Sequence, residues 1–141
     1  MVTFYVLSEY SQDPPTESGR VKIAIGPLYK LERVWALARD DDKVQALTRN
    51  CRRDVDKFFD GDYAQVAALI QATKASDYID SEWCENGSGG IAACDAYKVR
   101  QTEVIRATGK YVTFEYFLKF AIGRAGNLVL VVSCHTSWTW R

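Results

Sequence analysis

The chain has 141 residues, of which 48% are apolar, 26% charged and 13% aromatic. This composition excludes an intrinsically disordered chain, and the length predicts one domain that buries its own core without disulfide or metal cross-links. The overall charge is zero, but residues 1–90 hold 11 basic and 15 acidic residues, whereas residues 91–141 hold 7 and 3. The C-terminal third is therefore the expected face for a polyanion, unless its charges pair within the domain.

The N-terminus and the cysteines bear on the location of the protein. No basic region precedes the short apolar stretch of residues 2–7, and no window approaches the roughly 20 apolar residues of a membrane span. We therefore expect a cytoplasmic protein that has no membrane partner. The four cysteines show no paired short spacing, which favours reduced thiols over a disulfide framework or a metal site. A zinc site would have to draw on Cys84, Cys94, Cys134 and His135.

The first half of the chain is predicted to contain two short strands and three helices. Residues 2–7 and 20–26 are β-like runs on either side of a loop with two adjacent prolines, and we expect them to pair as a hairpin. Apolar residues at helical spacing predict helices over about 28–38 and about 43–59, the second capped by the three aspartates before it. Asp62 is expected to cap a third, shorter helix within the helical region that ends near residue 75.

The second half of the chain is predicted to be mainly β-structure. Residues 81–91 are rich in glycine and polar residues, which favours a mobile loop. Residues 92–100, 111–122 and 127–135 alternate or run apolar, and the turn sequences ATGK and GRAG separate them, as in an antiparallel meander. The expected fold class is therefore α+β, with N-terminal helices packed on a C-terminal antiparallel β-sheet.

His135 is the only histidine, and it ends the last predicted strand. If even-numbered residues form the core face of the last two strands and odd pairs with odd, His135 lies on the other face, near Glu115, Phe117 and Lys119. A register slip of one residue would place it beside Tyr116 instead. An imidazole there can serve as an acid or base at neutral pH, or can simply bond to backbone or to Glu115. The residues expected on the core face are Val112, Phe114, Tyr116, Leu118, Phe120 and Ile122, followed by Leu128, Leu130, Val132 and Cys134.

Seven short segments follow one another between Tyr29 and His135: YKLERVWAL, VQALTRNCRRDV, DYAQVAALIQA, SDYIDS, CDAYKVR, YFLKF and LVLVVSCH. In this order they resemble the MqsR-type toxins of bacterial toxin-antitoxin pairs, which belong to the RelE-like group of mRNA interferases. The resemblance spans roughly three quarters of the chain and omits its N-terminal part. It implies a cytoplasmic endoribonuclease that cleaves mRNA without a metal or other cofactor and that a cognate antitoxin protein binds and silences.

The resemblance also assigns individual positions. The family's catalytic lysine falls on His135, and its lysine in the preceding strand is retained as Lys119. Its Asp-x-Tyr element is retained as Asp95 and Tyr97. Its other chemical side chains are replaced, so that catalysis has either moved to other residues or been lost. The replaced positions are Ile79, Asp80, Cys94 and Phe117.

The implied chemistry needs a base for the ribose 2′-OH, a cation for the phosphorane charge and an acid for the leaving 5′-oxygen. We predict His135 as acid or base, Lys119 as phosphate stabiliser and Arg100 as substrate clamp. The alternative is a catalytically inactive MqsR-like protein that uses the same face for a protein partner. Trp138 and Trp140 would stack bases, or pack on the core or on a partner chain. Further RNA contacts are expected from Lys98, Tyr97, Arg106 and Arg124.

Overall fold

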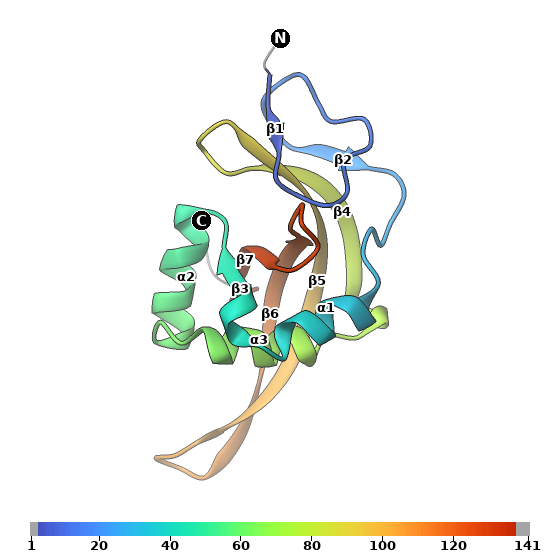
Figure 1. The fold of residues 1–141 in the computed structure, drawn as a ribbon. Coiled ribbons are helices and arrows are strands. Elements are labelled where there is room, and N and C mark those ends of the chain that lie inside the picture. Colours follow the sequence, from blue (N-terminus) through green and yellow to red (C-terminus); the bar gives the residue numbers. More distant parts are fainter. Residues whose placement is uncertain (1–2, 138–141) are drawn as a thin grey trace.

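The computed structural model describes residues 3–137 as a mixed α+β fold, in which three α-helices accompany one seven-stranded sheet (Figure 1). The predicted α+β class is therefore confirmed. The helices are α1 (Leu31–Ala38), α2 (Arg49–Phe59) and α3 (Tyr63–Gln71). The strands are β1 (Tyr5–Val6), β2 (Val21–Ile23), β3 (Val44–Ala46), β4 (Tyr78–Glu85), β5 (Gly90–Ile105), β6 (Lys110–Ile122) and β7 (Val129–Thr136).

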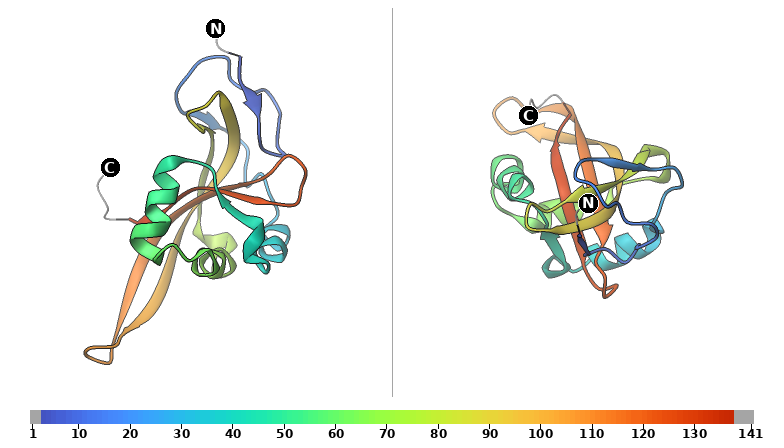
Figure 2. Two further views of the ribbon diagram at one scale, coloured as in Figure 1. Left: turned by 60° about the vertical axis from the view of Figure 1, so that its left-hand side comes forward. Right: turned by 90° about the horizontal axis from the view of Figure 1, so that it is seen from above.

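The centre of the sheet is an antiparallel meander of β4, β5, β6 and β7, and β2 and β3 extend it at the two ends. The predicted meander of the last three strands is confirmed, with turns at both expected turn sequences. β5 is longer than the predicted residues 92–100, because it begins at Gly90 and continues to Ile105. The β5 and β6 ribbon projects well beyond the helices (Figure 1 and the left view of Figure 2).

The predicted N-terminal hairpin is wrong, because β1 and β2 pair with different strands. β1 runs parallel to the start of β5, with Tyr5 opposite Gly90, whereas β2 runs antiparallel to β4. β6 pairs with β5 only from Asp95 onward, which leaves the edge of the first β5 residues open to β1. Each short strand thus satisfies its backbone groups on an available edge of the larger sheet.

The predicted mobile loop over residues 81–91 is also wrong. β4 continues through this segment to Glu85, and β5 begins at Gly90, so that a short turn joins them. The Asn86 side chain fixes the turn, since its Oδ1 accepts hydrogen bonds from Ser88 N and Gly90 N at 2.8 and 2.9 Å. Glycine-rich composition marks a tight β-turn here as readily as it marks a loop.

The helices differ from the predicted ones mainly at their first residues. α1 starts at Leu31 rather than at residue 28, because Leu28 N donates to the Asp95 carboxylate instead of entering the helix. Val44–Ala46 forms β3 beside β7, so that α2 starts at Arg49 with Thr48 as its N-cap. Asp62 caps α3, as predicted, but the helix ends at Gln71 and not near residue 75. Tertiary pairing of β3 therefore overrides the helical periodicity of residues 43–48.

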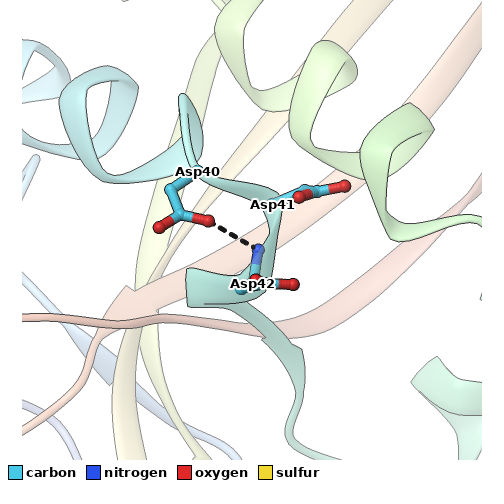
Figure 3. A group of neighbouring side chains, drawn as sticks. All are labelled: Asp40, Asp41 and Asp42. Atoms are coloured by element: carbon cyan, nitrogen blue, oxygen red, sulfur yellow. Dashed lines mark hydrogen bonds between the residues drawn. The ribbon is translucent and has the colours of Figure 1, made fainter.

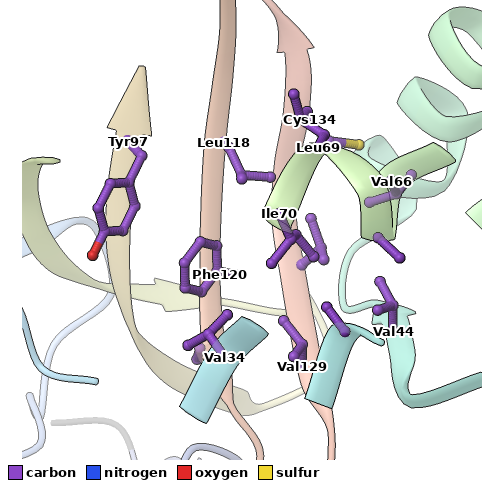
Figure 4. Packing of buried hydrophobic residues seen from close by; sticks show 14 of the residues in the cluster. Val34, Val44, Val66, Leu69, Ile70, Tyr97, Leu118, Phe120, Val129 and Cys134 are labelled. Carbon is purple, nitrogen blue, oxygen red and sulfur yellow. The ribbon is translucent and has the colours of Figure 1, made fainter. Parts of the chain in front are cut away.

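Buried side chains of the helices and of the sheet form a common core (Figure 4). Leu118 and Phe120 face Val34 and Ile70, and Tyr97 stacks on Phe120 at 5.4 Å between ring centroids. Phe59 of α2 lies over Tyr116, with ring centroids 5.5 Å apart. The even-numbered residues from Tyr116 to Ile122 are buried, as the alternation in this strand predicts.

A β-bulge in β7 changes which of its residues reach the core. Lys119 pairs with Ser133 but Phe120 pairs with Val131, so that Val132 is the extra residue. Before the bulge, the odd-numbered Val129 and Val131 are buried in the core; after it, the even-numbered Cys134 is. The prediction of an even core face is therefore right for Cys134 and wrong for the first half of the strand, where Leu128 and Leu130 lie outside the main core cluster.

Candidate functional site

A cleft of about 900 Å³ in the described part of the chain opens on the side of β6 and β7 away from the core residues Leu118 and Cys134. Its floor comes from Phe117 and Lys119 of β6 and from Ser133 and His135 of β7. The first turn of α2 forms one wall, and the β4–β5 turn with the segment before β2 forms the other. Arg49 and Arg20 contribute a cation to each wall.

The bulge is what turns His135 toward this cleft. Without the extra residue Val132, the alternation set by Val129 and Val131 would send position 135 into the core. With it, His135 lies directly opposite Phe117, and their rings stack at 5.6 Å with an interplanar angle of 23°. The predicted pairing of odd with odd residues is thus confirmed for His135 and Ser133 but not for the residues of β7 before the bulge, and the slip toward Tyr116 is not observed.

Hydrogen bonding defines the tautomer of His135. Its Nδ1 lies 2.9 Å from the backbone oxygen of Thr136. A carbonyl oxygen only accepts, so Nδ1 carries the proton and the neutral ring keeps its lone pair on Nε2. His135 therefore makes the backbone hydrogen bond expected of a purely structural residue. This bond occupies Nδ1 only, so it is compatible with a base at Nε2. Glu115 instead binds Arg100, with 3.3 Å between Nε and Oε2.

Lys119 does not stand free on the cleft floor as predicted. Its side chain is 4% exposed and forms an ion pair with Glu82, which is 2% exposed. The Lys119 Nζ also lies 5.4 Å from the centroid of the Phe117 ring. Glu82 neutralises the charge that a phosphate would need, so the role of Lys119 as an independent phosphate stabiliser is not supported by its surroundings.

Glu82 is surrounded by three cations. Besides Lys119, Lys22 Nζ lies 3.1 Å from Oε2 and Arg20 Nε lies 4.0 Å from Oε1. Burial alone raises the pKa of the Glu82 carboxyl, but hydrogen bonds and charges from Lys119 and Lys22 outweigh burial and hold the pKa below its usual range. The sequence gives little sign of this residue, because it belongs to the segment that resembles a mobile loop.

The other predicted residues lie at different distances from the cleft. Lys98 and Arg100 are exposed and pair across the ribbon with Phe117 and Glu115, on the cleft side of the sheet but outside the cleft lining. Arg106 and Arg124 sit in the turns at opposite ends of β6, and neither lines the cleft. The structure therefore separates both turn arginines from His135.

Tyr97, predicted to contact RNA, is wholly buried in the core. Burial, with a smaller contribution from the charge of Asp95, raises the pKa of its hydroxyl well above the usual range. It pairs with Leu118, and Phe120 covers one face of its ring. The prediction for Tyr97 is wrong because β5 alternates here toward the helices, a direction that residue type alone does not indicate.

Asp95 is a structural anchor rather than a cleft residue. Its buried carboxylate accepts hydrogen bonds from Leu28 N at 2.9 Å, Tyr29 N at 3.1 Å and Ser81 Oγ at 2.6 Å. Burial raises the pKa of Asp95, and these bonds oppose that effect. The carboxylate thereby ties the segment before α1 to β4 and β5.

The four positions at which this chain lacks the family's chemical side chains are dispersed in the structure. Ile79 is 41% exposed, Asp80 pairs with Lys22, and Cys94 is buried beneath the sheet surface. Only Phe117 of this group lines the cleft. These residues therefore do not form a shared site.

The cysteines and His135 do not assemble a zinc site. Cys134 faces the core, where its Sγ lies 3.7 Å from Cys51 Sγ, whereas His135 faces the cleft. Within residues 3–137, the only cluster of three potential metal ligands is exposed and consists of Asp40, Asp41 and Asp42 (Figure 3). Asp40 Oδ1 accepts from Asp42 N at 3.1 Å, so it caps the short 3₁₀ turn before β3 and not the predicted helix.

Trp138 and Trp140 lie outside the described residues, so the structure does not test their predicted roles. Among the helices that are described, none is both long and apolar enough to cross a membrane. Comparison of the chain with protein-family models, with curated proteins and with solved structures finds no match. The resemblance to MqsR-type toxins therefore stays a prediction.

Arg20 of the cleft wall and the neighbouring Glu82 were not predicted from the sequence. Arg49 has a weak signal, because it belongs to a cluster of basic residues at the start of α2. Arg20 and Lys22 are two residues apart, so an extended backbone places them on the same side. Only the pairing of β2 with β4 brings both of them near Glu82. No local pattern links residues so far apart in the sequence.

Proposed function

We propose that this chain is a metal-independent endoribonuclease that cleaves mRNA in the cytoplasm, as the toxin of a toxin-antitoxin pair of the MqsR type. One observation carries the proposal: His135 lies in the cleft with its tautomer set by Thr136, which leaves the Nε2 lone pair for proton transfer. The α+β class of the structure is compatible with the N-terminal helices and C-terminal sheet that the resemblance implies. A cognate antitoxin would silence such a protein by covering this cleft.

In the proposed reaction, Nε2 of His135 accepts the proton of the ribose 2′-OH, and the 2′-oxygen attacks the adjacent phosphorus. The 5′-oxygen leaves and takes a proton from solvent, which produces a 2′,3′-cyclic phosphate and a 5′-hydroxyl end. Because Glu82 neutralises Lys119, stabilisation of the phosphorane falls to Arg49 and Arg20 on the cleft walls. Arg100 lies farther along the same face, where it would hold the substrate strand.

Cleavage of an end-labelled mRNA fragment in the presence of EDTA tests this function. We expect His135→Ala to lower the rate by about 10²- to 10⁴-fold, the usual contribution of a positioned acid or base. The same substitution should relieve growth arrest on expression. Arg124→Gln is the matched control, because this arginine lies in a turn outside the cleft lining. Wild-type protein that neither arrests growth nor cuts RNA would overturn the proposal.

The second candidate is a catalytically inactive binding protein that uses the same face for a protein partner. The buried ion pair of Lys119 and Glu82 favours it, because the cleft floor then offers less free charge to a phosphorane. This candidate predicts that purified protein leaves RNA intact but forms a stable complex with the product of a neighbouring reading frame. Size-exclusion chromatography with an Arg49→Glu variant would show whether that complex uses the cleft wall.

A further inference from the structure

The ribbon formed by residues 98–105 of β5 and 110–115 of β6, here called the arm, projects from the body of the protein (Figures 1 and 2). The pairing of β4 with β5 ends at Tyr97, and the pairing of β7 with β6 ends at Tyr116. Within residues 3–137, no third strand pairs with the arm, and Ser137 N adds one backbone hydrogen bond to Glu115 O at the base of the arm, at 2.8 Å. An isolated two-stranded ribbon is marginally stable in water. The arm therefore adds little to the stability of the fold, which points to a role in binding.

One face of the arm continues the floor of the cleft. Side chains alternate along a strand, so the cleft residue Phe117 shares its face with every second residue of β6. Arg100 lies opposite Glu115, and the hydroxyls of Thr102 and Thr113 approach to 3.0 Å. The last pair on this face is Val104 with Tyr111. From Phe117 to Tyr111 the path is six residues, or about 20 Å at the usual rise of a strand.

The chemistry of this face suits a single-stranded nucleic acid. Tyr111 at the far end is 76% exposed, the largest exposure among the bulky apolar and aromatic residues described. Lys98 and Arg100 lie between it and the cleft, and the only carboxylate on this face is Glu115, which Arg100 binds. Proteins that bind single strands combine cations for the phosphates with aromatic rings on which bases stack.

The opposite face of the arm differs. Its exposed apolar residue is Ile105, its cation is Lys110, and its carboxylate Glu103 accepts a hydrogen bond from the Tyr116 hydroxyl at 3.0 Å. This face carries no exposed aromatic ring near its tip. The arm and the turn at its tip, residues 106–109, together hold four basic and two acidic residues, which complements a polyanion. The basic residues are Lys98, Arg100, Arg106 and Lys110, and the acidic ones are Glu103 and Glu115.

We propose that the arm is a second RNA-binding subsite, which carries the strand that leaves the His135 cleft. Tyr111 stacks on an unpaired base, and Lys98 and Arg100 bind the phosphates between that base and the cleft. This proposal rests on the proposed function, because it takes the ligand of the cleft to be RNA. It adds that affinity depends on substrate length, since a short strand fills the cleft and only a longer one reaches Tyr111.

Fluorescence anisotropy with labelled 2′-O-methyl RNA, which lacks the 2′-OH needed for cleavage, tests the arm directly. Oligonucleotides of about 4 and about 16 residues span the site sizes known for single-strand-binding folds. We expect wild type to bind the longer strand more tightly. Tyr111→Ala should weaken binding of the longer strand by about 5- to 150-fold, the range for the loss of one stacked base, and leave binding of the shorter strand unchanged. Ile105→Ala is the matched control and should change neither.

A second pair of variants isolates the phosphate contacts. Arg100→Gln should reduce the slope of log affinity against log salt by about 0.7 on the longer strand, the value for one phosphate contact. Lys110→Gln removes the same charge from the opposite face and should reduce it less. Equal effects of the two substitutions would show that the arm attracts RNA only through its overall charge. That result would overturn the proposed path of the RNA along the face with Arg100.

The outcomes separate the two proposals. If wild type binds RNA but Tyr111→Ala binds it equally well, the arm proposal fails and the cleft proposal stands. If wild type binds neither length, both fail. If Tyr111→Ala and Ile105→Ala both change the sedimentation behaviour of the protein and neither changes RNA affinity, the arm is an interface between copies of the chain, and the RNA path is wrong. Tyr111 is exposed, so thermal melting of its variant should match wild type and exclude misfolding.

Discussion

The ion pair of Lys119 and Glu82 makes a quantitative prediction, because both side chains are almost fully buried, at 4% and 2% exposure. Removal of one partner from a buried pair leaves an uncompensated charge and typically costs about 3–5 kcal/mol of folding free energy. Glu82→Gln leaves the Lys119 ammonium with a neutral amide, so we expect the free energy of unfolding to fall by about 3–5 kcal/mol.

The two partners are not equivalent. Glu82 keeps Lys22 at 3.1 Å when Lys119 is removed, whereas Lys119 pairs with no other carboxylate among residues 3–137. Lys119→Met should therefore cost less, about 1.5–3 kcal/mol, the range for loss of one hydrogen bond to a charged group. The double variant Lys119→Met/Glu82→Met removes both charges and should unfold within about 1 kcal/mol of wild type, since well-packed apolar pairs replace buried ion pairs at little cost.

Urea unfolding of wild type, Lys119→Met, Glu82→Met and the double variant at neutral pH gives the midpoints and slopes from which the coupling energy follows, and Glu82→Gln is measured beside them. The lowered pKa of Glu82 adds a pH dependence. Its contribution to stability is fully present above the ordinary glutamate value of 4.5 and is lost as the pH falls through the lowered value in the folded protein. Glu82→Gln should consequently show a shallower loss of stability in acid than wild type.

The reasoning is refuted if Glu82→Gln unfolds with a loss below about 1 kcal/mol, the value for a solvent-exposed pair. A double variant as unstable as the sum of the single variants would also contradict it, because two independent sites would behave in that way.

Three further predictions concern single positions. Thr48→Ala removes the N-cap of α2 and should lower the free energy of unfolding by about 1 kcal/mol, measured in urea, whereas Thr48→Ser should retain most of it. Asp95→Asn offers one acceptor oxygen where the carboxylate has two, so about 1–3 kcal/mol should be lost; a neutral effect would show that its backbone contacts are dispensable. Cys84, 8% exposed in the cleft, should react first with a thiol reagent, because a hydrogen bond from Cys94 and the charge of Lys119 lower its pKa against the effect of burial. Cys84→Ala should abolish that fast phase, and its persistence would contradict the assignment.

Patterns that lie within one element could be predicted from the sequence. The helical spacing of Val34 and Ala38, and that of Val66 and Ile70, describes contacts made by each helix face, and these residues are buried as expected. The alternation of β6 likewise identifies its core face. Such signals are local, because the period of a helix or strand is set by backbone geometry over a few residues.

The ends of elements and the edge strands could not be predicted in this way. Residues 44–46 have a helical pattern but form β3, because β7 offers them an open edge. Residues 2–7 and 20–26 look like the two strands of a hairpin, yet each pairs with a different strand of the main sheet. Strand pairing depends on which edges remain unfilled, and that is a property of the assembled sheet.

The candidate site also combines features that local sequence patterns predict with features that depend on the assembled sheet. By itself, the sequence determined that a single histidine ends the last strand and that its register brings it to Phe117 if odd residues pair. Only the tertiary structure decided that a bulge at Val132 turns His135 to the cleft and that Glu82 neutralises Lys119. Both depend on contacts between residues in different strands, the second across 37 positions of the chain, and no local periodicity encodes such contacts.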